Sequence, residues 1–275
     1  MPTNQRLPKF NAVIFDMDGL AIDSEPSFLF AWKQAAIEFG THLDDSLALS
    51  LLGRNAEEVE SALKQAIGEK FDGPHFRFLS ARFWREYVES KGIPPMPGLA
   101  SLLELLTSNR IPYALATNSD RHSASECLRL SGLENDFPLA VTRDQVSAGK
   151  PAPDVFLHAA RLLGVAASEC LVLEDSAIGL LAASRAGMTP LLVNAQPGRE
   201  SQQLAVMSFR SLHEVAEVVM KAWRWGSIGS LRAAGLAVVI ALSFYNPPCF
   251  APYVDNSIRR NTRRAAIGAL PWIGI

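Results

Sequence analysis

Two pairs of acidic residues stand at the ends of apolar segments in this sequence. Asp16 and Asp18 come after the run AVIF. Glu174 and Asp175 come after the run LVL. Side chains two residues apart in an extended backbone point to the same side, so we expect Asp16 and Asp18 to act together. Gly19, which follows them, permits a sharp turn and a close approach of the backbone. The pattern predicts a site that needs negative charge, and a surface turn is the alternative.

A divalent cation would balance this charge. Burying several carboxylates together is costly unless a cation is present, and a donor set made only of oxygens suits Mg²⁺. We therefore expect Mg²⁺ as a cofactor, bound within the four acids Asp16, Asp18, Glu174 and Asp175. Of these, Glu174 is the acid for which an indirect role beside Asp175 is an equal alternative.

Groups that suit a phosphate accompany the acids. Lys150, in the segment GKPAPD, supplies a compact positive charge, and Thr117 supplies a hydroxyl after the run YALA. Asn118 stands at an expected helix N-terminus, where backbone N–H groups and the helix dipole favour an anion, and a residue that only caps the helix is the alternative. Acids, a cation, a hydroxyl and a lysine together indicate phosphoryl transfer. One carboxylate can form an aspartyl phosphate, and the second can give a proton to the leaving oxygen and later take one from water.

Apolar segments that alternate with helical patterns would have to position these side chains. This alternation is typical of an α/β fold with a parallel sheet covered on both faces, and ligands bind such open sheets at the carboxyl ends of the strands. The sequence therefore predicts a Rossmann-like, doubly wound parallel sheet. The predicted strands are 11–16, 111–117, 138–142, 170–174 and 189–193, and the predicted helices are 99–108, 121–131, 155–163, 177–186 and 211–222.

One interval, from about residue 24 to residue 93, breaks the alternation because its pattern is helical only. It is too long for a crossover between strands, so we expect an inserted α-helical cap subdomain that returns through the turn-rich linker GIPPMPG. The predicted division of the chain is a core of residues 1–22 and 97–225, a cap of residues 23–96 and an atypical extension of residues 226–275. The helical segments expected within the cap are 28–39, 56–67 and 75–91.

The extension differs from the rest in charge. Residues 226–275 contain five arginines, one acid and no lysine, a net charge of +4, which leaves −6 for the first 225 residues. A poorly ordered segment, or sequence from an altered reading frame, is the simpler interpretation. The alternative is a short apolar helix with an arginine cluster that docks on a partner or on an anionic membrane surface.

Composition excludes several classes of protein. The 275 residues carry a net charge of −2, which argues against a nucleic-acid binder, and 48% hydrophobic with 20% charged residues is typical of a globular protein. Three scattered cysteines indicate neither a disulfide framework nor a zinc site. The first residues do not resemble a signal peptide, and no apolar run reaches the ~18 residues of a membrane span. We expect a cytoplasmic protein without a membrane span, whose partner is a small phosphorylated molecule; the oligomeric state is open.

Four motifs of the chain resemble, in order and spacing, those of the haloacid dehalogenase-like hydrolase superfamily. They are DMDGL, LATNS, GKPAPD and LEDSAIGLLAASRAGM. The likeness covers roughly residues 9–222 and points to the branch that contains β-phosphoglucomutases and small sugar-phosphate phosphatases. It implies a Rossmann-like core with a helical cap inserted after the first strand. It also implies that Arg54, in LLGRN, lies in a cap loop facing the active site and contacts the substrate, with a surface arginine as the alternative.

The resemblance also implies roles for the candidate residues. Asp16 would be the nucleophile and Asp18 the general acid and base. Thr117 and Lys150 would hold the transferring phosphoryl group. The implied Mg²⁺ ligands are Asp16, the backbone carbonyl of Asp18, and Asp175, with assistance from Glu174.

These residues favour one reaction over its rivals. Dehalogenase members lack an acid two residues after the nucleophile, so Asp18 favours phosphoryl chemistry. β-Phosphoglucomutases carry a histidine where Phe28 stands and a lysine where Asp120 stands, which favours a phosphatase over a mutase. The predicted function is therefore a Mg²⁺-dependent phosphatase of small phosphorylated metabolites, with a hexose-phosphate mutase as the alternative. A non-enzymatic phospho-receiver module is disfavoured because receivers need neither Asp18 nor a cap.

Overall fold

The computed structural model describes residues 7–52 and 56–233. A six-stranded sheet forms the centre of the core, and all five pairs of neighbouring strands are parallel. This confirms the predicted α/β, Rossmann-like class. The strand order is β3-β2-β1-β4-β5-β6, with β1 (Ala12–Phe15), β2 (Tyr113–Ala116), β3 (Ala140–Val141), β4 (Cys170–Glu174), β5 (Thr189–Val193) and β6 (Met207–Phe209).

Apolar side chains cover both faces of the sheet, as the continuous apolar strands require. In β1, Val13 and Phe15 point into one hydrophobic cluster, and Ala12 and Ile14 point into the other. The first cluster includes side chains of α5 (Leu99–Ser108), α6 (Arg121–Leu130) and α10 (Leu212–Ala233); the second includes side chains of α7 (Asp154–Leu163) and α8 (Ala177–Arg185). The remaining core segments are α9 (Arg199–Leu204) and the 3₁₀ turns η2 (Arg143–Gln145) and η3 (Ala167–Glu169).

The cap is helical, as predicted. It consists of α1 (Glu25–Glu38), α2 (Asp45–Leu51), α3 (Ala56–Ile67), η1 (Gly68–Lys70) and α4 (Gly73–Lys91). The Phe28 ring stacks against two tryptophans, with centroid distances of 6.1 Å to Trp32 and 6.5 Å to Trp84. Helices α1 and α4 therefore share an aromatic core, and the aromatic residues of the cap serve mainly its own packing.

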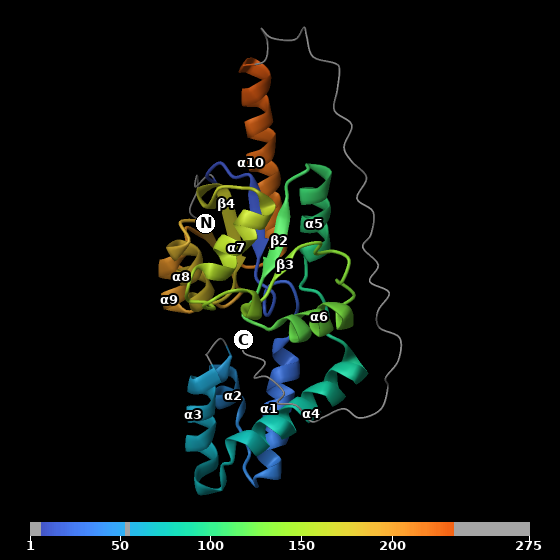
Figure 1. Ribbon diagram of the computed structural model, residues 1–275, viewed down its shortest axis with the longest axis vertical. Helices are drawn as coiled ribbons and strands as arrows, with labels where there is room; N and C mark the ends of the chain where they lie inside the picture. Colours follow the sequence, from blue (N-terminus) through green and yellow to red (C-terminus); the bar gives the residue numbers. More distant parts are fainter. Residues whose placement is uncertain (1–6, 53–55, 234–275) are drawn as a thin grey trace.

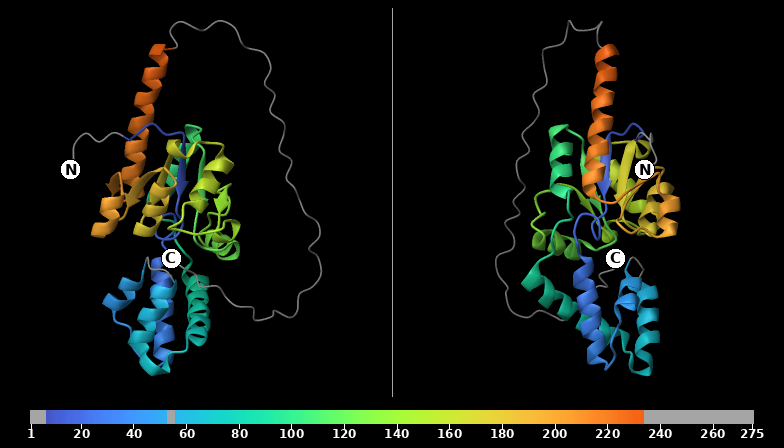
Figure 2. Two further views of the ribbon diagram at one scale, coloured as in Figure 1. Left: turned by 60° about the vertical axis from the view of Figure 1, so that its left-hand side comes forward. Right: turned by 180° about the vertical axis from the view of Figure 1, so that it is seen from behind.

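Two antiparallel chain segments connect the cap to the core. Asp23 N donates to Pro94 O at 2.9 Å, and Met96 N donates to Ala21 O at 2.9 Å, with a bridge between Ile22 and Pro95. The chain leaves β1 at its carboxyl end and passes directly to α1, so that end of the sheet faces the cap (Figure 1). Both views of Figure 2 place the cap below the core, as Figure 1 does.

The structure extends the predicted elements in a few places. Strand β6 and the short helices α2 and α9 were not predicted, and α10 continues to Ala233 instead of ending near residue 222. Residues 234–275, which make up most of the predicted extension, lie outside the described residues. Among the helices that the structure describes, none is long and apolar enough to cross a membrane.

Candidate active site

Three neighbouring strands deliver polar side chains to one edge of the sheet. Asp16 directly follows β1, Thr117 directly follows β2, and Glu174 ends β4. Strand β1 pairs with β2 on one side and with β4 on the other, so the three strand ends are adjacent. This is the place where the strand order reverses, and open parallel sheets bind ligands there.

Lys150 joins these groups from the loop that follows β3. Its Nζ donates to Asp16 Oδ1 and, at 2.6 Å, to Glu174 Oε1. The ammonium also lies 4.8 Å from the centroid of the Phe156 ring, and the lysine side chain is only 4% exposed. Burial alone would lower the pKa of Lys150, but the charges of Asp16 and Glu174 outweigh it and raise that pKa. Lys150 is therefore a fixed positive charge beside Asp16.

The acidic groups at this edge fit a divalent cation. Ligand oxygens of Asp16, Glu174 and Asp175 lie within 4.8 Å of one another. Burial, followed by the charge of Glu174, raises the pKa of Asp16 to about 7; the same causes raise the pKa of Asp175. The single charge of Lys150 thus does not balance three carboxylates. An oxygen-only donor set of this charge suits Mg²⁺.

Glu174 is less available than its neighbours in this cluster. Its Oε1 accepts from Lys150, and its Oε2 accepts from Ser176 Oγ at 2.9 Å and from Ser176 N at 3.2 Å. Both oxygens of this fully buried carboxylate therefore already have donors. The sequence left two roles open for Glu174 at the Mg²⁺ site, a direct ligand and an indirect, supporting group. The arrangement fits the supporting role better.

Gly179, in the first turn of α8, leaves the space that Glu174 occupies. A Cβ at this position would lie 1.7 Å from Glu174 Oε1 and 1.9 Å from its Cδ. Gly179→Ala should therefore displace the buried carboxylate and lower the free energy of unfolding by about 1–3 kcal/mol, as overpacking does. Urea unfolding of the variant would measure this. Gly198→Ala is the control, because no atom beyond its neighbours in the chain lies within 4 Å of a Cβ there; equal stability of the two variants would contradict the steric argument.

Asp18 is buried beside the cluster in a more neutral environment. Its Oδ2 accepts from Ser119 Oγ at 3.2 Å, and among the described residues its Oδ1 has no well-formed hydrogen bond. Burial raises the pKa of Asp18, and the nearby hydroxyls of Ser24 and Ser119 oppose the rise. A raised pKa favours the protonated carboxyl that a general acid needs. The sequence motif LATNS contains Ser119, but its contact with Asp18, 101 residues away, could not be read from the motif.

The backbone conformation of Gly19 explains why a glycine follows the two aspartates. Its φ of +76° is in the left-handed region, and a Cβ there would lie 2.3 Å from Asp175 Oδ2. The turn after β1 therefore needs glycine both for its conformation and for its close approach to Asp175.

The two residues after β2 differ in what their side chains do. Thr117 is buried, and its Oγ1 accepts from Ser119 N at 3.0 Å. The side-chain amide of Asn118 binds the backbone of Lys150: Lys150 N donates to Asn118 Oδ1, and Asn118 Nδ2 donates to Lys150 O. Thr117 thus lies at the edge of the sheet beside Asp16, where its phosphate-binding role stays a prediction, and the Asn118 side chain holds the backbone of Lys150.

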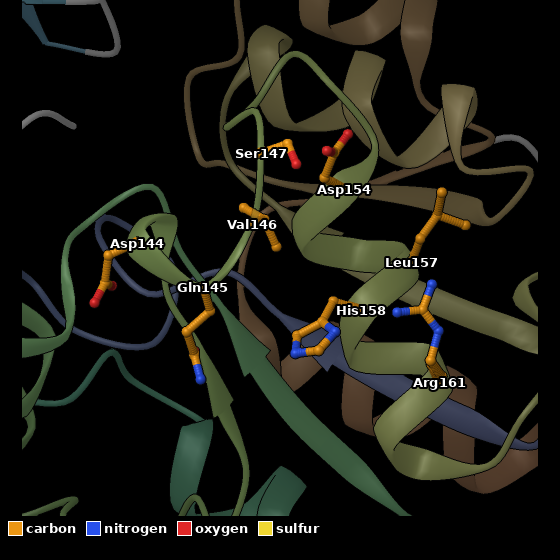
Figure 3. Close-up of a pocket in the computed structure, with 8 residues that line it drawn as sticks. All are labelled: Asp144, Gln145, Val146, Ser147, Asp154, Leu157, His158 and Arg161. Atoms are coloured by element: carbon orange, nitrogen blue, oxygen red, sulfur yellow. The ribbon is translucent and has the colours of Figure 1, made fainter.

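Two further features lie apart from the carboxylates. Arg54, the predicted substrate contact of the cap, lies outside the described residues. A groove of about 570 Å³ lies on the core between the residues just before Lys150 and helix α7 (Figure 3). None of the candidate site residues lines it, so we do not assign the chemistry there. Its lining residues are Asp144, Gln145, Val146, Ser147, Asp154, Leu157, His158 and Arg161.

Comparison with known proteins assigns the fold and the site to a class of enzymes. Residues 10–187 match the family model of haloacid dehalogenase-like hydrolases. The chain therefore belongs to the haloacid dehalogenase-like hydrolase family, as its motifs predicted, and it is an enzyme of that family. Its membership excludes the phospho-receiver module considered from the sequence.

Individual relatives define the branch. The chain is 34% identical to a phosphorylated carbohydrates phosphatase of Thermotoga maritima, over 64% of this chain and 82% of the relative. It is also 34% identical to a β-phosphoglucomutase of Bacillus subtilis, over 64% and 80%. A solved HAD family hydrolase from Deinococcus radiodurans, with bound phosphate and sodium, matches with a TM-score of 0.67 and 29% identity over 78% of this chain and 96% of that one. These relatives confirm the predicted branch and, with it, the prediction of a phosphoric monoester hydrolase.

Proposed function

We propose that the chain is a Mg²⁺-dependent phosphatase that hydrolyses small phosphorylated metabolites, sugar phosphates or similar phosphoesters, through an aspartyl phosphate on Asp16. The observation that carries the proposal is the position of Asp16: its carboxylate is held by Lys150 at the edge of an acidic cluster, with the buried carboxyl of Asp18 two residues away. The names of the phosphatase relatives support the choice of substrate class.

Asp16 would attack the phosphorus, so that a bond forms from its carboxylate oxygen and the ester bond to the leaving oxygen breaks. Asp18 would give its proton to that leaving oxygen and would then take a proton from the water that hydrolyses the aspartyl phosphate. Lys150 and the hydroxyl of Thr117 would hold the phosphoryl oxygens. Because the amide of Asn118 is engaged with Lys150, we assign the contact with the phosphoryl group to its backbone N–H.

Mg²⁺, held by Asp16, Asp175 and the backbone carbonyl of Asp18 with support from Glu174, would neutralise part of the charge that gathers on the phosphoryl oxygens. The cap would cover the substrate and exclude bulk water, and its loops would set the specificity. Arg54 stays a proposed substrate contact on the sequence argument alone.

A hexose-phosphate mutase is the alternative, and identity does not decide between the two because phosphatase and mutase relatives match equally well. Phe28 occupies the place of the mutase histidine and is packed between tryptophans, so it supplies no acid or base. Asp120 occupies the place of the mutase lysine, and its carboxylate accepts from Ser123 N and Ser123 Oγ, both at 3.0 Å, as the N-cap of α6. Both positions favour transfer to water.

The test is release of inorganic phosphate from sugar phosphates, phosphoglycolate and an aryl phosphate, each assayed with Mg²⁺ and with a chelator. We expect turnover of at least one sugar phosphate that depends on the metal, because the three clustered carboxylates otherwise repel an anionic substrate. Conversion of a hexose 1-phosphate to the 6-phosphate without phosphate release would favour the mutase instead. Turnover that is unaffected by the chelator would contradict the metal dependence.

A further inference from the structure

We infer that Asn118 is a positioning residue that sets the place of Lys150 in the active site, an inference that rests on the role proposed for Lys150. The side chain of Asn118 makes a reciprocal pair of hydrogen bonds with the lysine backbone. Lys150 N donates to Asn118 Oδ1 at 2.7 Å, and Asn118 Nδ2 donates to Lys150 O at 3.1 Å. The two residues are 32 positions apart, so this pair ties the end of β2 to the loop that carries the lysine.

Other side chains hold this loop at neighbouring residues. The guanidinium of Arg143 donates to Val146 O at 3.0 Å and to Ser147 O at 3.3 Å, and Asp154 Oδ1 accepts from Ala148 N at 3.2 Å. Asp154 also lies at the wall of the groove in Figure 3. Within the described residues, Asn118 is the side chain that holds both backbone groups of Lys150 itself.

Gly149 shows how closely the loop fits against Asn118. A Cβ at Gly149 would lie 2.5 Å from Asn118 Oδ1 and 2.5 Å from Arg143 Cδ. The loop therefore approaches the asparagine at the residue just before the lysine. A side chain at Gly149 would push the loop away from Asn118. The close fit is therefore what we expect if the Asn118 amide fixes the position of the loop.

The lysine side chain is flexible and does not by itself fix the place of its ammonium. The position of the lysine backbone therefore helps to decide where the ammonium lies. Its ammonium has to lie between Asp16 and Glu174, at a place where the side chain is 4% exposed. Asn118 directly follows Thr117, so the amide fixes the distance between the two groups proposed to hold the phosphoryl oxygens. A shift of about 1 Å in such a group can reduce catalysis about 10²-fold.

Asn118→Ala therefore should reduce kcat/KM for phosphate release about 10²-fold. The matched control is Asn109→Ala, because Asn109 Nδ2 also donates to a backbone carbonyl, that of Leu105 at 2.7 Å, but at the end of α5 before β2 begins. We expect the control to stay within about 2-fold of the wild type. If Asn118→Ala does not fold by circular dichroism, Asn118→Asp replaces it, since it keeps the acceptor for Lys150 N and loses the donor to Lys150 O. Equal activity of the Asn118 variant and the control would overturn the inference.

A double-mutant cycle separates positioning of Lys150 from a general structural effect. If Asn118 acts through Lys150, adding Asn118→Ala to Lys150→Ala should cost no more than about 2-fold in kcat/KM beyond Lys150→Ala alone. Losses that multiply fully would overturn the inference, because Asn118 would then act independently of the lysine.

An activity-independent measurement keeps this inference distinct from the proposed function. In protein labelled with ¹⁵N-lysine, the buried, ion-paired ammonium of Lys150 should give a slowly exchanging NMR signal, identified by its loss in Lys150→Ala. Asn118→Ala should shift or broaden that signal, whereas Asn109→Ala should leave it unchanged; an unchanged signal in Asn118→Ala would count against the positioning role. If the signal responds but the wild type releases no phosphate from any substrate, the positioning is retained and the proposed function fails.

Discussion

Replacing Asp16 by asparagine should abolish phosphate release, with a loss on the order of 10⁴-fold or more, because an amide cannot form the acyl phosphate that the carboxylate forms. The substitution keeps an oxygen that can accept from Lys150, so the fold around the site should persist. The measurement is turnover of the best substrate with saturating Mg²⁺. Wild type quenched in acid during turnover should carry one phosphate on the peptide that contains residue 16, and the variant should carry none.

Asp44→Asn is the matched control for this prediction. Asp44 Oδ1 caps α2 in the cap by accepting from Leu47 N at 2.7 Å, and asparagine caps helices equally well. Full activity in the control together with near-complete loss in Asp16→Asn would identify the carboxylate that reacts. Retention of activity within about 10-fold in Asp16→Asn would show that another group is the nucleophile.

The same variant should change how the stability of the metal-free protein depends on pH. The folded-state pKa of Asp16 is raised to about 7 from its ordinary value of 3.8, chiefly by burial and by the charge of Glu174. Between these values the folded state binds a proton that the unfolded state does not, so stability falls as pH rises through that window. An asparagine side chain does not titrate, and Asp16→Asn should therefore lose less stability than wild type between about pH 4 and pH 7 in urea unfolding. The pKa of Asp175 is also raised, so this residue should still make the stability of Asp16→Asn fall as pH rises.

The sheet could be predicted from the sequence because its central strands are continuous apolar runs. All residues of the strands 12–15 and 170–174 are buried. A short, continuous apolar run of this kind is typical of a parallel strand that helices cover on both faces of the sheet. Strand β6 was missed because it has three residues and lies at the edge of the sheet, with Ser208 exposed. Its pairing with β5, and not its own pattern, makes it a strand.

The short helices were missed for a related reason. Helix α2 has seven residues and α9 has six, too few for a helical period to emerge from the sequence. Helix α2 is stabilised by its Asp44 cap and by burial of Ala48 and Leu51 in the cap subdomain. Such tertiary contacts are decided by residues far away in the chain.

The polar residues at the strand ends were easier to predict from the sequence than the hydrogen bonds that they make. Acids that end apolar strands meet at one edge by topology alone, which brings Asp16 and Glu174 together. The sequence could not show that the amide of Asn118 is directed to Lys150 or that Ser176 holds the second oxygen of Glu174. Those choices depend on side-chain rotamers and on space left by Gly149 and Gly179, which act across loops and helices.

Replacing Asp18 by asparagine should have the second largest effect, a loss of about 10²–10⁴-fold for a sugar phosphate, since Asp18 would protonate the leaving oxygen. An alkoxide is a poor leaving group and needs that proton, whereas an aryl oxide can leave without it. The loss in the first step should therefore be much smaller for an aryl phosphate. Asparagine can still accept from Ser119 Oγ through its oxygen, so the buried contact is kept.

Asp18→Asn should also slow the second half of the reaction, because the same carboxyl would activate the water that hydrolyses the aspartyl phosphate. With an aryl phosphate, the variant should then release about one equivalent of the aryl alcohol rapidly and turn over slowly afterwards, a burst that marks accumulation of the phosphoenzyme. Rapid mixing with absorbance detection would measure this, with Asp44→Asn as the control that shows wild-type kinetics. Equal losses for sugar and aryl phosphates without a burst would mean that Asp18 supports the structure of the site and transfers no proton.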